Sequence, residues 1–152
     1  MNKMLATDDS LTLTAQRLLV AAVMFPHGAQ KLFGWFGGYG FSGTLGYFAS
    51  LGIPSVLGVL VILGESLGAL ALAFGLFSRL TALGISAAML GALLMVHLPN
   101  GFFMNWFGNQ PGEGIEFGLL MLGLSVPIVV RGGGRFALDS LLGAPIPAAQ
   151  PA

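Results

Sequence analysis

The sequence contains no cysteine and very little charge. Without a cysteine among its 152 residues, the protein has no structural disulfide, no thiolate metal ligand and no thiol of its own for disulfide exchange. Charged residues make up 8% of the chain, against about 25% in a typical soluble domain. Basic and acidic residues balance and form no basic run, which argues against nucleic acid as a partner because that binding depends on clustered Lys and Arg.

Motifs of several enzyme classes are missing as well. There is no P-loop, no dinucleotide fingerprint and no Ser-His-Asp arrangement, and the glycine-rich segment 37–43 follows no predicted strand. The paired Glu-x-x-His motifs of a ferritin-type di-metal site are also absent. Haem bound by His27 and His97, and a single metal held by both histidines and a glutamate, remain alternatives. We expect neither a haem nor a metal, and no cleaved signal peptide.

What the chain has in abundance is apolar sequence. Hydrophobic residues make up 55% of the chain, and the mean hydropathy is +0.87. Four apolar stretches approach the about 20 residues that a membrane-spanning helix needs: residues 11–32, 55–77, 80–98 and 114–130. The sequence therefore predicts an all-α integral membrane protein with four transmembrane helices. We expect an N-terminal tail over 1–10, one membrane domain over 11–142 and a flexible C-terminal tail over 143–152.

The connections between these stretches predict the topology. Only Ser78 and Arg79 separate the second stretch from the third, which favours an antiparallel hairpin within an up-down-up-down four-helix bundle. In this arrangement both termini lie on one side of the membrane. That side carries most of the cations outside the spans: Lys3, Arg79, Arg131 and Arg135. The positive-inside rule then places both termini in the cytoplasm.

Aromatic residues concentrate in the two loops expected on the opposite side. The loop over 33–54 contains Trp35 and the loop over 99–113 contains Trp106, each among several Phe or Tyr residues. Such a one-sided concentration indicates loops that dip into the lipid headgroup region and cover the mouth of the bundle; anchoring is the simplest use. Trp35 and Trp106 are also candidate substrate-binding residues. Within the first loop, residues 44–51 are predicted to form a short interfacial helix.

Small residues at helical spacing predict close packing. Gly64 and Gly68 form one GxxxG pair, and Gly114 and Gly118 form another. In lipid this spacing lets helix backbones approach closely. We expect both pairs to pack within the chain, with homodimer contacts as the alternative.

Ionisable residues within the apolar stretches are the candidates for function. A charge at mid-membrane costs at least about 2.5–3.5 kcal/mol and usually faces the bundle interior. Glu65 is too short to reach an interface, and Arg17 is its expected partner, either as a structural pair or as a proton-handling pair. The candidate catalytic residues are His27, Glu65, His97 and Glu116, and Arg17 and Lys31 join the two tryptophans as candidate substrate-binding residues. His27, Lys31, His97 and Glu116 are expected to converge in the extracytoplasmic half.

Several short motifs follow one another in a recognisable order. They are Arg17, His27-Gly28-x-x-Lys31, Gly52-x-Pro54, Gly64-Glu65, Gly75-Leu76-x-x-Arg79, His97, Gly114-x-Glu116 and Gly132-Gly133-Gly134-Arg135-Phe136-x-Leu138-Asp139. Together they span residues 13–142 and resemble the DoxX family of small bacterial inner-membrane proteins. The resemblance implies a multi-pass, four-helix protein of the inner membrane that serves as an oxidoreductase or as a subunit of quinone-linked oxidoreductase complexes.

Three functions are compatible with the sequence. The first is a quinone-linked membrane oxidoreductase component, with a polar site in the extracytoplasmic half and electrons supplied by a partner redox subunit. The second is a non-catalytic anchor or assembly subunit of a redox complex. The third is a pathway for a small solute or for protons. It is the least favoured of the three, because a single four-helix bundle has little room for alternating access and shows no obvious inverted repeat.

Overall fold

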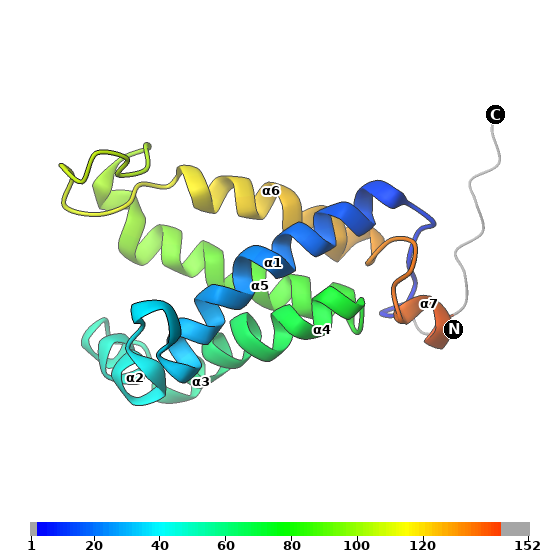
Figure 1. Cartoon of the computed structure of the whole chain (residues 1–152), viewed down its shortest axis with the longest axis horizontal. Helices are drawn as coiled ribbons and strands as arrows, with labels where there is room; N and C mark the ends of the chain where they lie inside the picture. Colours follow the sequence, from blue (N-terminus) through cyan, green and yellow to red (C-terminus); the bar gives the residue numbers. More distant parts are fainter. Residues whose placement is uncertain (1–2, 144–152) are drawn as a thin grey trace.

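A computed structural model describes residues 3–143 of the chain. The described residues form helices and loops without a strand, and Figure 1 shows their arrangement. The α-helices are α1 (Leu11–Phe33), α2 (Gly40–Ser50), α3 (Ser55–Leu63), α4 (Ala69–Phe74), α5 (Ser78–Ala92), α6 (Glu116–Arg131) and α7 (Asp139–Leu142). Residues 144–152, which make up most of the predicted C-terminal tail, lie outside the described residues.

Two continuous helices include π-helical segments, in which the hydrogen bonds reach one residue further than in an α-helix. Gly64–Gly68 joins α3 to α4, and Leu93–His97 extends α5 toward a short turn over Leu98–Asn100. The combined helices, Ser55–Phe74 and Ser78–Asn100, are long and apolar enough to cross a membrane. By the same test of length and composition, α1 and α6 are not among the candidate spans in the described chain.

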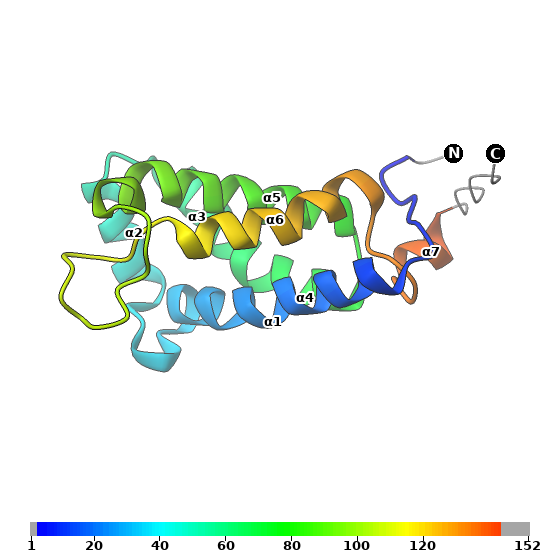
Figure 2. The ribbon, with the colours of Figure 1, turned by 90° about the horizontal axis from the view of Figure 1, so that it is seen from above.

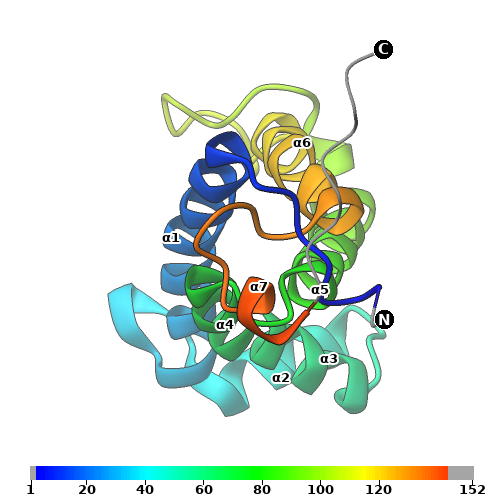
Figure 3. The ribbon, with the colours of Figure 1, turned by 90° about the vertical axis from the view of Figure 1, so that its right-hand side faces the viewer.

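The long helices pack side by side as a bundle. α1 contacts α4 and α6, while α5 contacts α4 and α6, so that the four surround a common core in the end-on view of Figure 3. Fully buried apolar side chains fill this core: Val20, Met24, Leu72, Ile85 and Ile128. Figure 2 shows the helices running roughly along one axis.

The hairpin between the second and third predicted helices turns earlier than the sequence suggested. α4 ends at Phe74, and Gly75 (φ 70°) and Phe77 (φ 51°) adopt left-handed conformations. Ser78 and Arg79, the predicted connection, are instead the first residues of α5. Gly75 is suited to this turn because glycine has no Cβ to clash at positive φ. A Cβ there would also lie 2.6 Å from Nη1 of Arg17.

The predicted short helix in the first loop is confirmed, but it is longer. α2 runs from Gly40 to Ser50 rather than over 44–51. It packs against α3, where a Cβ at Gly58 would meet Leu45 and Phe48 at 2.8 and 3.0 Å. α2 therefore covers the first turns of α3. α1 contacts this continuous helix mainly at its later segments, Gly64–Gly68 and α4.

The two GxxxG pairs differ in what surrounds them. A Cβ on Gly118 would lie 2.4 Å from Leu93, and one on Gly114 would lie 2.4 Å from Phe103 O, so this pair packs within the chain as predicted. The same prediction is wrong for the other pair. A Cβ on Gly64 would have no neighbour within 4 Å, and one on Gly68 would meet only Leu63 O, at 3.7 Å.

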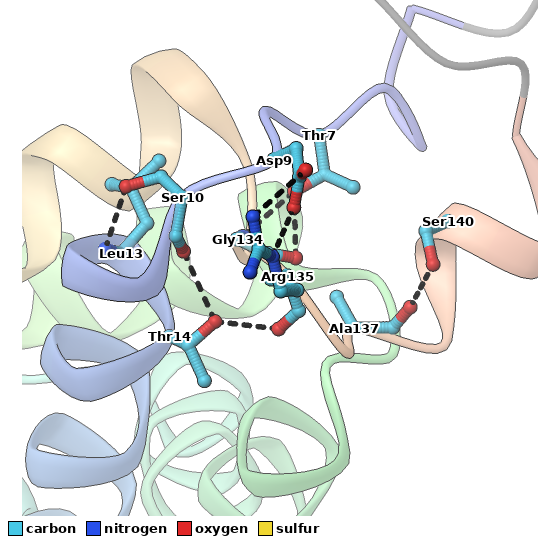
Figure 4. A network of polar contacts seen from close by, with 9 residues as sticks. All are labelled: Thr7, Asp9, Ser10, Leu13, Thr14, Gly134, Arg135, Ala137 and Ser140. Atoms are coloured by element: carbon cyan, nitrogen blue, oxygen red, sulfur yellow. Dashed lines mark hydrogen bonds and ion pairs between the residues drawn. The ribbon is translucent and has the colours of Figure 1, made fainter.

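Three segments close one end of the bundle, which we call the terminal end: residues 3–10, 75–79 and 131–143. Figure 4 shows the polar contacts there between the N-terminal segment and the glycine run. Thr7 Oγ1 accepts a hydrogen bond from Gly134 N at 2.7 Å, and Arg135 binds Asp9 through Nε (2.5 Å) and Nη2 (3.0 Å). Asp8 forms an ion pair with Arg131. The opposite end, which carries the loops over 34–54 and 98–115, is called the aromatic end.

The glycine run of the last predicted motif lies where side chains do not fit. A Cβ on Gly133 would lie 2.3 Å from Ser78 Oγ, and one on Gly134 would lie 2.5 Å from Thr14 N. Gly132 (φ 87°) and Gly134 (φ 81°) also have left-handed backbones. The run therefore allows the C-terminal segment to lie directly against both α1 and α5.

Candidate functional site

A salt bridge joins α1 to the π-helical segment Gly64–Gly68. Lys31 Nζ lies 2.5 Å from Glu65 Oε2. Glu65 is 7% exposed, whereas 26% of the Lys31 side chain is accessible. A carboxylate this deeply buried must be neutralised or paired, and Lys31 supplies the pairing charge.

The predicted pairing of Glu65 with Arg17 is wrong. Arg17 Nη1 donates to Leu72 O at 3.1 Å and to Ala73 O at 2.7 Å, near the end of α4. Along α1, Arg17 lies eleven residues before Gly28, or about 16 Å at 1.5 Å per residue. It thus sits far from the level of Glu65, and within electrostatic range of the buried carboxylate of Asp139.

The position of Gly28 fixes the level of the salt bridge. A Cβ on Gly28 would lie 2.3 Å from the carbonyl carbon and oxygen of Glu65, so the two backbones are in direct contact there. Lys31 follows Gly28 by three residues and lies on the same side of α1. Thr44 of α2 adds a hydrogen bond from its Oγ1 to Lys31 O at 3.3 Å. α1, α2 and the π-helical segment thus all hold the pair.

His27 completes a cluster of three titratable side chains. It precedes Lys31 by four residues, which places both on one face of α1, and it interacts electrostatically with both Lys31 and Glu65. Its ring lies 5.8 Å from the ring of Phe117 of α6, centroid to centroid. The cluster of His27, Lys31 and Glu65 therefore combines three groups that can exchange protons, with Phe117 beside His27.

His97 and Glu116 lie at the aromatic end but have other partners. His97 Nδ1 is 2.9 Å from Glu113 O, and Glu116 Oε2 accepts a hydrogen bond from Met104 N at 3.2 Å. Both contacts hold the loop between α5 and α6. The sequence predicted that these residues converge with His27 and Lys31. They lie at the same end of the bundle, but their described contacts are with the loop.

The two predicted tryptophans lie on separate loops of the aromatic end. Trp35 is 53% exposed and packs against Phe33, with ring centroids 5.0 Å apart. Trp106 is 75% exposed. Both indoles face outward, so their role as substrate-binding residues stays a prediction.

Two polar features escaped the sequence interpretation. Asp139, the last residue of the final motif, is 1% exposed and accepts hydrogen bonds from Phe77 N and Ser78 N at 2.7 Å each. It thereby caps the start of α5. Ser86 and Ser125, 2.8 Å apart between their Oγ atoms, join α5 to α6 inside the core. An Asp five residues after the last glycine of the run was the available signal for the first, whereas isolated serines gave none for the second.

Metal-ligand geometry was sought among the side chains of residues 3–143. This part of the chain holds no group of three or more His, Asp or Glu residues arranged to bind a metal ion. His27 and His97, which would have to share a metal or a haem, are engaged with Phe117 and with Glu113 O respectively.

Comparison with known proteins bears on the family. A sequence model of the DoxX family matches residues 12–98, which contain α1 to α5 and the whole His27, Lys31 and Glu65 cluster. The motifs after Pro99 lie outside the matched range. Searches of curated proteins and of solved structures gave no significant match. With more than half of its length matched, and with two helices of membrane-spanning length, the chain belongs to the DoxX family of membrane proteins.

Proposed function

We propose that this protein is a quinone-linked oxidoreductase component whose quinone site is the cluster of His27, Lys31 and Glu65. The observation that carries the proposal is the 2.5 Å salt bridge of a buried glutamate at a π-helical segment, because such segments occur frequently at functional sites. Intramembrane ionisable residues also mark functional sites in general.

The chemistry of the cluster matches what a quinone requires. Reduction of a quinone to a quinol takes up two electrons and two protons. Lys31 and His27 can donate hydrogen bonds to the quinone oxygens, Glu65 can exchange protons with them, and Phe117 can contact the ring face. In this proposal a partner redox subunit supplies the electrons. Five other candidate residues act in this proposal by supporting the helices and loops around the cluster: His97, Glu116, Trp35, Trp106 and Arg17.

The proposed setting is the bacterial inner membrane, with four transmembrane helices in up-down-up-down order. α1 and α6 cross beside the two helices of membrane length, because they pack along them in the same bundle. The terminal end carries Lys3, Arg79, Arg131 and Arg135, which favours a cytoplasmic location for both termini. The cluster then lies in the extracytoplasmic half, within reach of quinones dissolved in the bilayer.

A non-catalytic anchor or assembly subunit is the second candidate. It is favoured by the structural use of buried and half-buried charges: Arg17 binds carbonyls of α4, Asp139 caps α5, and half-buried Arg79 donates from Nε to Ala6 O at 2.9 Å. In that case the salt bridge between Lys31 and Glu65 would only lock two helices together.

Bound quinone separates the two candidates. Gently purified protein would be extracted with solvent, and its quinone measured by mass spectrometry against the bulk membrane. We expect near-stoichiometric quinone in the native protein and in Gly64→Ala, and its loss in Glu65→Gln of equal thermal stability. Quinone no higher than in the bulk membrane for all three proteins would refute the quinone site and leave the anchor.

A further inference from the structure

We propose that the two loops of the aromatic end form a preformed surface that inserts into the lipid headgroup and upper acyl region of the bilayer. We define this aromatic rim by six side chains: Trp35, Phe36, Phe102, Phe103, Trp106 and Phe107. All six are more than half exposed, and Phe107 reaches 90%. The inference rests on the proposed membrane topology and is independent of quinone binding.

The loop between α5 and α6 pairs several of its polar groups internally, while Gln110 Oε1 is buried without a hydrogen-bond partner. Ile115 N donates to Gly101 O at 3.1 Å and Glu116 N donates to Phe102 O at 2.9 Å, which ties its two ends together. Asn105 and Gln110 bind each other twice, at 3.0 and 3.1 Å. Backbone groups that are paired in this way lose fewer hydrogen bonds when the surrounding water is reduced.

The carboxylates of this loop turn onto its own backbone. Glu113 is the only charged residue between 101 and 115, and its Oε2 accepts from Asn105 N at 2.6 Å. Glu116 Oε2 accepts from Met104 N at 3.2 Å. The loop therefore directs its aromatic side chains outward while its charges bind internally, the reverse of an ordinary water-exposed loop.

The loop after α1 also forms internal hydrogen bonds and exposes its aromatic side chains. Gln30 Nε2 donates to Phe36 O at 3.3 Å, and Gly38 N donates to Trp35 O at 3.0 Å. Gly38 packs so closely that a Cβ would lie 2.3 Å from Gln30 O. Two loops far apart in sequence thus share one construction and project from the same end in Figures 1 and 2.

Lipid, rather than a second protein, is the partner that fits this surface. The exposed residues Leu94, Met95 and Leu98 on a membrane-length helix lead directly into Phe102 and Phe103, so the rim continues the lipid-facing side of the bundle. Tryptophan and other aromatic residues prefer this boundary. The terminal end also exposes apolar side chains, among them Phe136, Leu141 and Leu142, but it differs because exposed Arg131, Arg135 and Asp9 accompany them.

The two tryptophans of the chain, one on each loop, report on insertion separately. Trp35→Phe leaves Trp106 as the reporter, and Trp106→Phe leaves Trp35. Each variant would be reconstituted into phosphatidylcholine vesicles brominated either near the glycerol or near the chain end. We expect blue-shifted emission, stronger quenching by the shallow bromines and weak quenching by aqueous acrylamide for both reporters. Water-like emission with full acrylamide quenching and no effect of bromine would overturn the proposal, and would point to a protein partner on the rim.

Glu113→Ala in the Trp35→Phe background tests whether the internal bonds hold the loop. We expect Trp106 to lose most of its shallow quenching and to gain acrylamide quenching. The same substitution in the Trp106→Phe background should leave the quenching of Trp35 unchanged, which shows that the bundle is still folded. Unchanged quenching of Trp106 would refute the role assigned to Glu113.

Discussion

The direct contact between α1 and the π-helical segment Gly64–Gly68 provides a quantitative test of the packing at the site. A methyl group on Gly28 would lie 2.3 Å from the carbonyl carbon and oxygen of Glu65, whereas ordinary contact begins at 3.4 Å. Gly28→Ala must therefore separate the two backbones by about 1.1 Å, because a backbone carbonyl cannot rotate away as a flexible side chain can. Overpacking of this kind costs about 1–3 kcal/mol.

Gly64→Ala is the matched control for this substitution. Gly64 is adjacent to Glu65, but a Cβ there would have no neighbour within 4 Å, and alanine favours a helix by up to about 1 kcal/mol over glycine. Reversible unfolding in mixed detergent micelles, followed by circular dichroism, gives the free energy of unfolding of each variant. We expect it to fall by about 1–3 kcal/mol for Gly28→Ala and to stay equal or rise for Gly64→Ala. Equal stability of both variants would refute the close approach of the helices.

Three further predictions concern the terminal end and the topology. Asp139→Asn leaves one of two buried backbone donors unpaired, so we expect the free energy of unfolding to fall by about 2–3 kcal/mol in the same assay; a fall no larger than that of Asp9→Asn would contradict the cap. A hydrogen bond from Arg135 lowers the pKa of Asp9 below its ordinary value of 3.8, so this carboxylate stabilises the fold above that pH and loses its contribution as the pH falls through the lowered pKa. Asp9→Asn should therefore flatten the acid side of a stability titration below about pH 4, and an unchanged titration would exclude the contribution. Since the chain has no cysteine, Asn109→Cys and Leu141→Cys can report topology: an impermeant maleimide should label the first in intact cells and the second only after lysis, and the opposite pattern would reverse the orientation.

The sequence predicted the helices well because hydrophobic length and turn residues act locally. Pro54 marks the start of α3 and Gly34 ends α1 in a left-handed conformation, close to the expected boundaries. The resemblance to the DoxX family was confirmed over residues 12–98. The observed helix boundaries at Phe74 and Ser78 differ from the predicted ones because the turn between them uses residues with left-handed backbone conformations. An apolar run of sequence does not reveal these conformations.

The pairing of charges could not be predicted, because it depends on how the helices are shifted along one another. The expected pairing with Arg17 assumed that this residue lies at a depth similar to that of Glu65 and reaches it with its long side chain. In the structure α2 covers the first turns of α3 at Gly58, and Glu65 lies level with Gly28 and Lys31 instead. The π-helical segment at Glu65 has no sequence signature, and the tight fit of the glycine run exists only once α1 and α5 are placed beside it.

An exchange of the two charges at the site tests the central claim most directly. The double variant Lys31→Glu, Glu65→Lys keeps a salt bridge between the same positions but reverses its direction relative to His27. If the cluster binds quinone, the double variant should regain part of the stability lost by each single variant yet hold no quinone when extracted and measured by mass spectrometry. Quinone recovered together with stability would show that the pair only joins two helices, and would contradict the assignment of the quinone site.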